Sequence, residues 1–217
     1  MKTVFASMER WFRRHSIRNL MTYVVGGMLV VFLMDFLLPS LNLTSWLYLN
    51  WHLVMRGQVW RLLTFVLLPP SSSLVWILFS LYFYWLIGNA LENHWGTARF
   101  NMFYFVGILG NILAAAITGS GTNTYLNLSL FLAFAAVYPN FELMLFFFLP
   151  VKVKYLALLD VVLYGWNLIV GPWSVRAAIV FSLLNVILFF GGDLISTIRR
   201  ESSYWKTRAN FRRAMRR

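Results

Sequence analysis

The amino-acid sequence predicts an all-α membrane protein formed by one bundle of six transmembrane helices. Hydrophobic residues make up 60% of the 217-residue chain and charged residues only 12%, whereas a soluble domain carries about 25% charged residues. Lysine and arginine also gather in alternate connections between apolar stretches, as they do in multi-pass proteins. We expect the bundle to span residues 20–193, between a basic N-terminal segment, 1–19, and a basic C-terminal tail, 194–217.

Each predicted helix is an apolar stretch close to the length of about 20 residues that crosses a bilayer. The six stretches are residues 20–38, 74–91, 100–119, 125–138, 155–170 and 175–192. The fourth is short and stops at Pro139, since proline cannot continue a helix. Residues 144–150 are too few to cross, and we expect an interfacial segment or a buried lead-in to the fifth helix. A seventh span there would place the termini on opposite sides.

The distribution of basic residues predicts the orientation of the bundle. With both termini in the cytoplasm, 16 of the 19 lysine and arginine residues lie inside, as the positive-inside rule requires. We therefore expect a multi-pass protein of a bacterial plasma membrane. The net charge of +12 is concentrated beside the first and last spans, where basic residues contact anionic lipid. This favours the lipid bilayer over nucleic acid as a partner, and the basic tail can also bind a cytoplasmic protein.

The connection between the first two predicted helices, residues 40–73, is long, apolar and aromatic. Trp46, Trp51 and Trp60 occur within it, and tryptophan prefers the membrane–water interface. We expect this connection to be a structured element on the outer membrane surface rather than a solvated loop.

Three motifs occur in order along the chain. The first, "GQVWRLLTF", contains Trp60 and Arg61. The second places Gly88, Glu92 and Gly96 four residues apart, on one face of a helix. The third is "PNFELMLFFFLPVKVKYLAL", residues 139–158. Together with six spans, these motifs resemble the rhomboid superfamily of intramembrane serine proteases and their inactive relatives, including the Derlins.

The resemblance implies a structural frame made of Trp60, Arg61, Gly88, Glu92 and Gly96. We expect the Arg61 guanidinium to bond carbonyls of the first loop. We expect Glu92 to be satisfied by Arg99 or by backbone donors near Gly96, because a buried carboxylate needs partners. The glycines allow helices to approach closely.

The catalytic positions that the resemblance implies are degenerate. The oxyanion histidine and asparagine of active rhomboids align with Trp76 and Ser80. The nucleophile position falls on Thr124 or on Asn127, depending on the gap chosen, and neither is a serine followed by glycine. The Trp76 ring is expected to fill the former catalytic space.

The general base is also missing from its expected place. The predicted sixth helix contains no histidine, and the whole chain has only three, His15, His52 and His94. A serine nucleophile needs a base within hydrogen-bond reach. The resemblance therefore implies a pseudoprotease without cofactor or metal, which binds transmembrane segments of client proteins and influences their quality control, degradation or trafficking.

The resemblance also implies where clients enter, and two other functions are considered beside a pseudoprotease. Clients would approach between the second and fifth helices, past a gate formed by Phe79, Phe83, Tyr164 and Trp166. A divergent protease could use Ser129, Thr124 or another hydroxyl with a base other than histidine. A small transporter would need internal repeats, which the sequence does not show. For Asp160, we expect a structural ion pair with Lys152 or Lys154.

Overall fold

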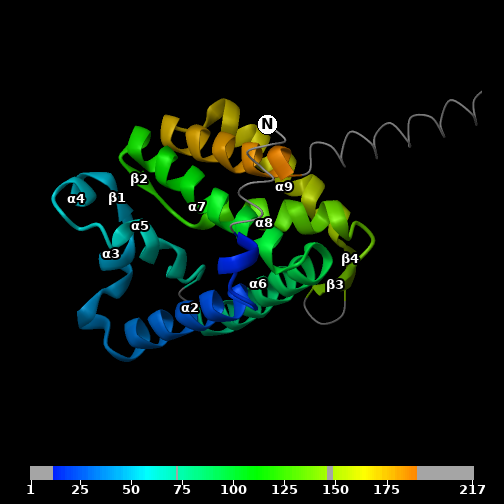
Figure 1. Ribbon diagram of the computed structural model, residues 1–217, viewed down its shortest axis with the longest axis horizontal. Helices are drawn as coiled ribbons and strands as arrows, with labels where there is room; N and C mark the ends of the chain where they lie inside the picture. Colours follow the sequence, from blue (N-terminus) through cyan, green and yellow to red (C-terminus); the bar gives the residue numbers. More distant parts are fainter. Residues whose placement is uncertain (1–11, 72, 146–148, 190–217) are drawn as a thin grey trace, which may run out of the picture.

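The computed structural model describes residues 12–71, 73–145 and 149–189, and its ribbon is almost entirely helical (Figure 1). Four helices are long and apolar enough to cross a membrane: α2 (Leu20–Leu37), α6 (Leu74–Trp95), α7 (Thr97–Thr118) and α9 (Val153–Val170). Two apolar helices are shorter, α8 (Thr124–Val137) and the helix Trp173–Phe189. The all-α membrane fold is thus confirmed, and the fourth and sixth predicted spans correspond to these shorter helices. The predicted tail, 194–217, lies outside the described residues.

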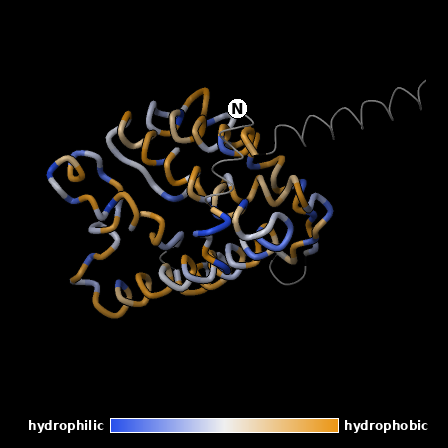
Figure 2. The backbone as a smooth tube through the Cα atoms, viewed as in Figure 1, coloured by the Kyte–Doolittle hydropathy of each residue, from blue (hydrophilic) through white to orange (hydrophobic). Residues whose placement is uncertain are grey.

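The helices pack around α6, which contacts α2, α7 and α8, whereas α9 packs mainly against α8. Hydrophobic residues cover the outer as well as the inner faces of the helices (Figure 2). Large apolar side chains exposed in this way are expected where lipid replaces water around a bundle. The core itself contains fully buried aromatic and aliphatic side chains, among them Phe65, Phe100, Phe103, Phe134 and Met28.

Two glycines permit the closest helix contacts in the bundle. A Cβ atom added to Gly88 of α6 would lie 2.0 Å from Cγ of Met21 in α2. A Cβ atom added to Gly107 of α7 would lie 2.6 Å from Leu126 in α8. Small residues at such crossings let helix backbones approach where no hydrophobic effect drives association in lipid.

The connection between α2 and α6 is structured, as its composition predicted, and lies at one end of the bundle, called here the loop end (Figure 1). Its elements are η1 (Pro39–Leu41), α3 (Leu43–Leu47), β1 (Leu49–Asn50), α4 (Trp51–Met55), α5 (Arg61–Thr64) and η2 (Phe65–Leu67). Strand β1 pairs antiparallel with β2 (Ser120–Gly121), which follows α7. Asp35 of α2 accepts hydrogen bonds from the backbone N–H groups of Leu43 and Thr44 and so holds the start of α3.

A β-hairpin precedes α9, where the sequence predicted an interfacial segment or a buried lead-in. Strands β3 (Glu142–Leu145) and β4 (Leu149–Lys152) pair antiparallel with Glu142 opposite Lys152. The side chains of Lys152 and Glu142 form an ion pair of 3.9 Å, and the Lys154 ammonium lies over the Tyr155 ring. The predicted ion pair between Asp160 and either lysine is therefore wrong, because both lysines interact elsewhere.

The described part of the N-terminal segment is tied to the opposite end of the bundle, called here the Glu92 end. Asn101 of α7 accepts a hydrogen bond from the Ile17 N–H at 3.2 Å and donates one to the Ile17 carbonyl at 2.9 Å. The Phe12 ring packs against Phe105 of α7, with 5.9 Å between centroids. Residues 12–19 are thus part of the packed structure and not only a charged leader.

Candidate functional site

Glu92 organises the junction between the N-terminal segment, α6 and α7. Its side chain is 5% exposed. Oε1 accepts hydrogen bonds from the Asn19 N–H at 3.0 Å and from the Thr97 hydroxyl at 2.9 Å. The expectation that Arg99 satisfies this carboxylate is wrong, since Arg99 is exposed and the donors are Asn19 and Thr97. Glu92 therefore joins three separate segments.

The two remaining glycine positions of this motif support the same junction. Gly88 gives α2 the space described above. Gly96 lies between α6 and α7 and has a φ of +83°. Residues other than glycine rarely adopt a positive φ of this size. The Gly96 N–H donates to the Glu92 carbonyl at 2.8 Å. A sharp turn at Gly96 allows α7 to return beside α6.

Arg61 plays the corresponding role at the loop end. The residue is 4% exposed, and Nη1 donates to the carbonyls of Ser45 and Tyr48 at 2.8 and 2.7 Å. Nε donates to the Gln58 side chain at 2.7 Å. These are the loop carbonyl bonds expected for the guanidinium, whereas the neighbouring Trp60 ring remains exposed. A planar group with several donors can hold two carbonyls in this way, and an ammonium cannot reproduce its geometry.

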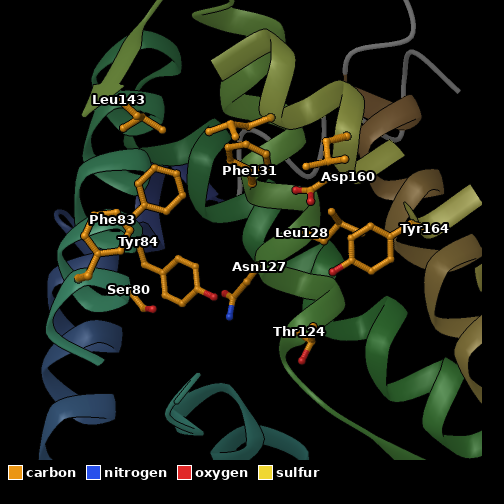
Figure 3. Close-up of a pocket in the computed structure, with 13 residues that line it drawn as sticks. Ser80, Phe83, Tyr84, Thr124, Asn127, Leu128, Phe131, Leu143, Asp160 and Tyr164 are labelled. Atoms are coloured by element: carbon orange, nitrogen blue, oxygen red, sulfur yellow. The ribbon is translucent and has the colours of Figure 1, made fainter. Parts of the chain in front are cut away.

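Between the two ends, a pocket of about 320 Å³ lies among α6, α8, α9 and the hairpin (Figure 3). Its apolar lining is Phe79, Phe83, Leu128, Phe131, Leu143, Leu156 and Leu159. Its polar lining is Ser80, Tyr84, Thr124, Asn127, Asp160 and Tyr164. The polar groups lie from the loop end of α8 to the middle of α9, so the pocket carries polar chemistry at a depth where lipid surrounds the bundle.

Asn127 occupies the centre of this pocket. The side chain is 4% exposed, and neither its oxygen nor its nitrogen makes a hydrogen bond of standard geometry with a described residue, although the Tyr84 hydroxyl interacts with the amide. The Tyr84 hydroxyl points toward the amide from α6, and the Tyr164 ring points into the pocket from α9 (Figure 3). Buried polar groups are nearly always paired in folded proteins, so an incompletely satisfied amide facing a cavity marks this pocket as the candidate functional site.

The Rhomboid domain family model matches residues 56–198. This stretch is well over half of the chain and contains Arg61, Glu92 and every residue that lines the pocket. The chain belongs to the rhomboid family. No curated protein matches it.

In this rhomboid, three of the four positions predicted to be degenerate catalytic positions line the same pocket. Ser80 lies in α6, and Thr124 and Asn127 lie in α8. Trp76 does not join them: it is 52% exposed and packs edge-on against Phe79 with 6.5 Å between centroids. The prediction that the Trp76 ring fills the former catalytic space is wrong, because the side chain faces outward and leaves the pocket open.

The predicted client gate is also only partly assembled. Phe79, Phe83 and Tyr164 line the pocket. The Phe83 ring packs on Phe131, and the Tyr164 ring packs on Tyr125. Trp166 is 65% exposed and does not contribute to the lining. The gate prediction therefore holds for three positions as lining residues and fails for Trp166.

Among the residues that the structure describes, no histidine lines the pocket of this rhomboid. His94 packs against Tyr138 at the Glu92 end, with 5.7 Å between ring centroids, and His52 lies beside Gly119 in the loop-end structure. Ser129 is buried in α8 and donates to the Leu126 carbonyl at 2.7 Å, which is the backbone bond that serine commonly makes inside helices. The described residues also contain no group of three side chains suited to a metal ion.

Two pocket residues were missed as site residues by sequence reasoning. Tyr84 lies on the same helical stripe as Ser80, Gly88 and Glu92, four residues from each neighbour, and this spacing could have revealed it. Asp160 was assigned to an ion pair because two lysines are near in sequence. The sequence did not reveal the hairpin, in which Lys152 pairs with Glu142 while Asp160 lines the pocket.

Proposed function

We propose that this rhomboid binds transmembrane segments of client proteins without cleaving them, and so influences their quality control, degradation or trafficking. The supporting observation is a pocket whose described lining has hydroxyl and amide groups, at positions that the sequence resemblance aligns with catalytic residues of the family, and no histidine. The sequence of the helix that should supply the base, 173–189, contains none. A hydroxyl without a base within hydrogen-bond reach is a poor nucleophile.

A binding function also suits the side of the pocket formed by α9. Only 6% of the membrane-length window of α9 is buried, and α9 packs mainly on α8. On the α6 side, the pocket has an apolar rim that includes Phe79 and Phe83, and Phe79 is 37% exposed. A client helix can pack on this rim and present polar groups to the interior, where they avoid contact with lipid.

A photo-crosslinking experiment tests binding directly. The protein is reconstituted with a labelled single-span model helix, and a photoreactive amino acid replaces Phe79 or Tyr164. A matched control replaces Leu113, which is exposed on α7 and does not line the pocket. We expect several times more capture of the helix at Phe79 and Tyr164 than at Leu113. Equal capture at all three positions would overturn the proposal.

A divergent protease is the second candidate, because Thr124, Ser80 and Asp160 line one pocket. In that case a hydroxyl would attack the client carbonyl and Asp160 would accept its proton. A carboxylate is a weaker base than imidazole near neutral pH, so we favour binding. A fluorophosphonate probe separates the two candidates: labelling that disappears in Thr124→Ala or Ser80→Ala would establish a protease.

A further inference from the structure

Asp160 is a carboxylate at membrane depth with no hydrogen-bond or ion-pair partner in the described part of the chain. It lies seven residues after the first residue of α9, which is about 10 Å along the helix axis. The carboxylate faces the pocket (Figure 3). It makes no hydrogen bond or ion pair with another described residue, because Lys152 is paired with Glu142 and Lys154 lies over the Tyr155 ring.

The described groups around Asp160 include hydrogen-bond acceptors but no basic side chain. Within residues 12–71, 73–145 and 149–189, no lysine or arginine lines the pocket, although the chain carries 19 basic and only seven acidic residues. The Asn127 amide, which interacts with the Tyr84 hydroxyl, lies across from Asp160, and the Tyr164 hydroxyl is nearby (Figure 3). Every one of these groups can accept a hydrogen bond. The pocket therefore offers one negative charge and several acceptors, with no resident cation.

We infer that this pocket selects client helices that carry a lysine or arginine within the membrane span, whose basic group pairs with Asp160 and donates to Asn127. This inference rests on the proposed client-binding function and names its substrate class. Ionisable groups inside membranes are costly alone and are stabilised by pairing with one another. A basic client residue and Asp160 each lack a partner before binding, so one contact satisfies both.

The shape of the pocket fits a side chain rather than a whole helix. A volume of about 320 Å³ accommodates a lysine or arginine side chain that enters from a helix packed on the rim. The apolar part of such a side chain can lie along Phe79 and Phe83 while its charged head reaches Asp160, since long basic side chains combine an apolar stem with a polar tip. A metal ion is a poorer occupant, because Asp160 is the only carboxylate in the lining.

The test measures binding of three synthetic helices to the full-length protein in phosphatidylcholine vesicles by energy transfer. The helices share one leucine–alanine span and the same flanking residues, and differ only at a central position that holds lysine, leucine or glutamate. We expect wild-type protein to bind the lysine helix about 3- to 30-fold more tightly than the leucine helix, the range given by polar contacts between membrane helices. Asp160→Asn should remove this preference.

Two variants make the outcome specific to the pocket. Asp160→Lys should reverse the preference, so that the glutamate helix binds more tightly than the lysine helix. Glu142→Gln neutralises a carboxylate on the exposed hairpin and should leave the preference for lysine unchanged. If wild-type protein binds all three helices equally, or if Glu142→Gln acts like Asp160→Asn, the inference is wrong while client binding stands. If it binds none of them, the proposed function fails as well.

Discussion

The side of the molecule built by α2, α6 and α7 differs sharply from the side built by α9. Half of the membrane-length window of α7 is buried, against 6% of that of α9. On the first side, Glu92 and Asn101 connect separate segments through hydrogen bonds. On the second side, Asp160 forms no hydrogen bond or ion pair with a described residue, and Val153 is the only buried residue of α9.

The chain therefore combines a well-packed group of helices, α2, α6 and α7, with a less buried helix, α9. The pocket lies between α6 and α9. Segments with few buried contacts open at a lower free-energy cost than segments in a core. We therefore expect α9 to move more readily than α6 when a client helix arrives. The same substitution should have very different consequences on the two sides.

Glycine-to-alanine substitutions give the largest expected contrast. In Gly88→Ala, the new methyl group would lie 2.0 Å from Met21 Cγ, so α2 and α6 must separate. Overpacking of this kind costs about 1–3 kcal/mol or more, and the melting temperature in detergent should fall clearly. In Gly165→Ala of α9, no atom lies within 4 Å of the added Cβ. The melting temperature should then stay the same or rise slightly. A similar fall in melting temperature in both variants would show that the two sides of the molecule do not differ in packing.

The Glu92 junction gives the next largest effect. Glu92→Ala removes the shared acceptor of two part-buried hydrogen bonds, from the Asn19 N–H and the Thr97 hydroxyl, and each lost bond costs about 0.5–1.5 kcal/mol. Glu92→Gln keeps one oxygen as an acceptor and should lose much less stability. Thermal melts of both variants in the same detergent check this prediction. It would be contradicted by equal destabilisation, which would make the negative charge rather than the acceptor the important property.

Arg61 should act locally at the loop end. Arg61→Ala removes the donors that hold the carbonyls of Ser45 and Tyr48, so amide hydrogen exchange in residues 40–71 should accelerate. Arg61→Lys should restore protection only in part, because one ammonium cannot match the planar guanidinium. Exchange in α7 serves as the internal reference. Unchanged exchange in the loop-end elements would mean that their aromatic residues hold them without Arg61.

Trp76 should give the smallest effect. Because this ring is half exposed and does not line the pocket, Trp76→Ala should change the free energy of unfolding by only about 0.5 kcal/mol, as surface substitutions do. Phe100→Ala, which truncates a fully buried ring, should cost about 3–5 kcal/mol. A large loss in Trp76→Ala would show that the ring supports the bundle after all.

The sequence predicted those features that depend on local composition or on one helical face. Apolar stretches located the helices, because their lengths and boundaries follow from hydropathy and proline. The four-residue spacing of Gly88, Glu92 and Gly96 placed them on one stripe, and the structure joins that stripe to α2 and α7. The role of Arg61 followed from the chemistry of a guanidinium beside unpaired carbonyls.

Features that depend on contacts between distant segments could not be predicted in this way. The donors to Glu92 include Asn19, which is 73 residues away in the sequence, and no local pattern reveals it. The orientation of Trp76 depends on how α6 is rotated in the bundle. The ring is half exposed and does not line the pocket, which the sequence had predicted it to fill. In the β3–β4 hairpin, Lys152 pairs with Glu142 rather than with Asp160, and Asp160 lines the pocket.

The most direct test of the account measures client capture and cleavage in one sample. The protein is reconstituted with a fluorescent single-span helix that carries a central lysine, and both complex formation and the appearance of fragments are followed over time. We predict a complex that Asp160→Asn weakens, with no fragments from wild-type protein at any time. Fragments that form with wild-type protein and disappear with Thr124→Ala or Ser80→Ala would contradict the account and identify this rhomboid as a protease.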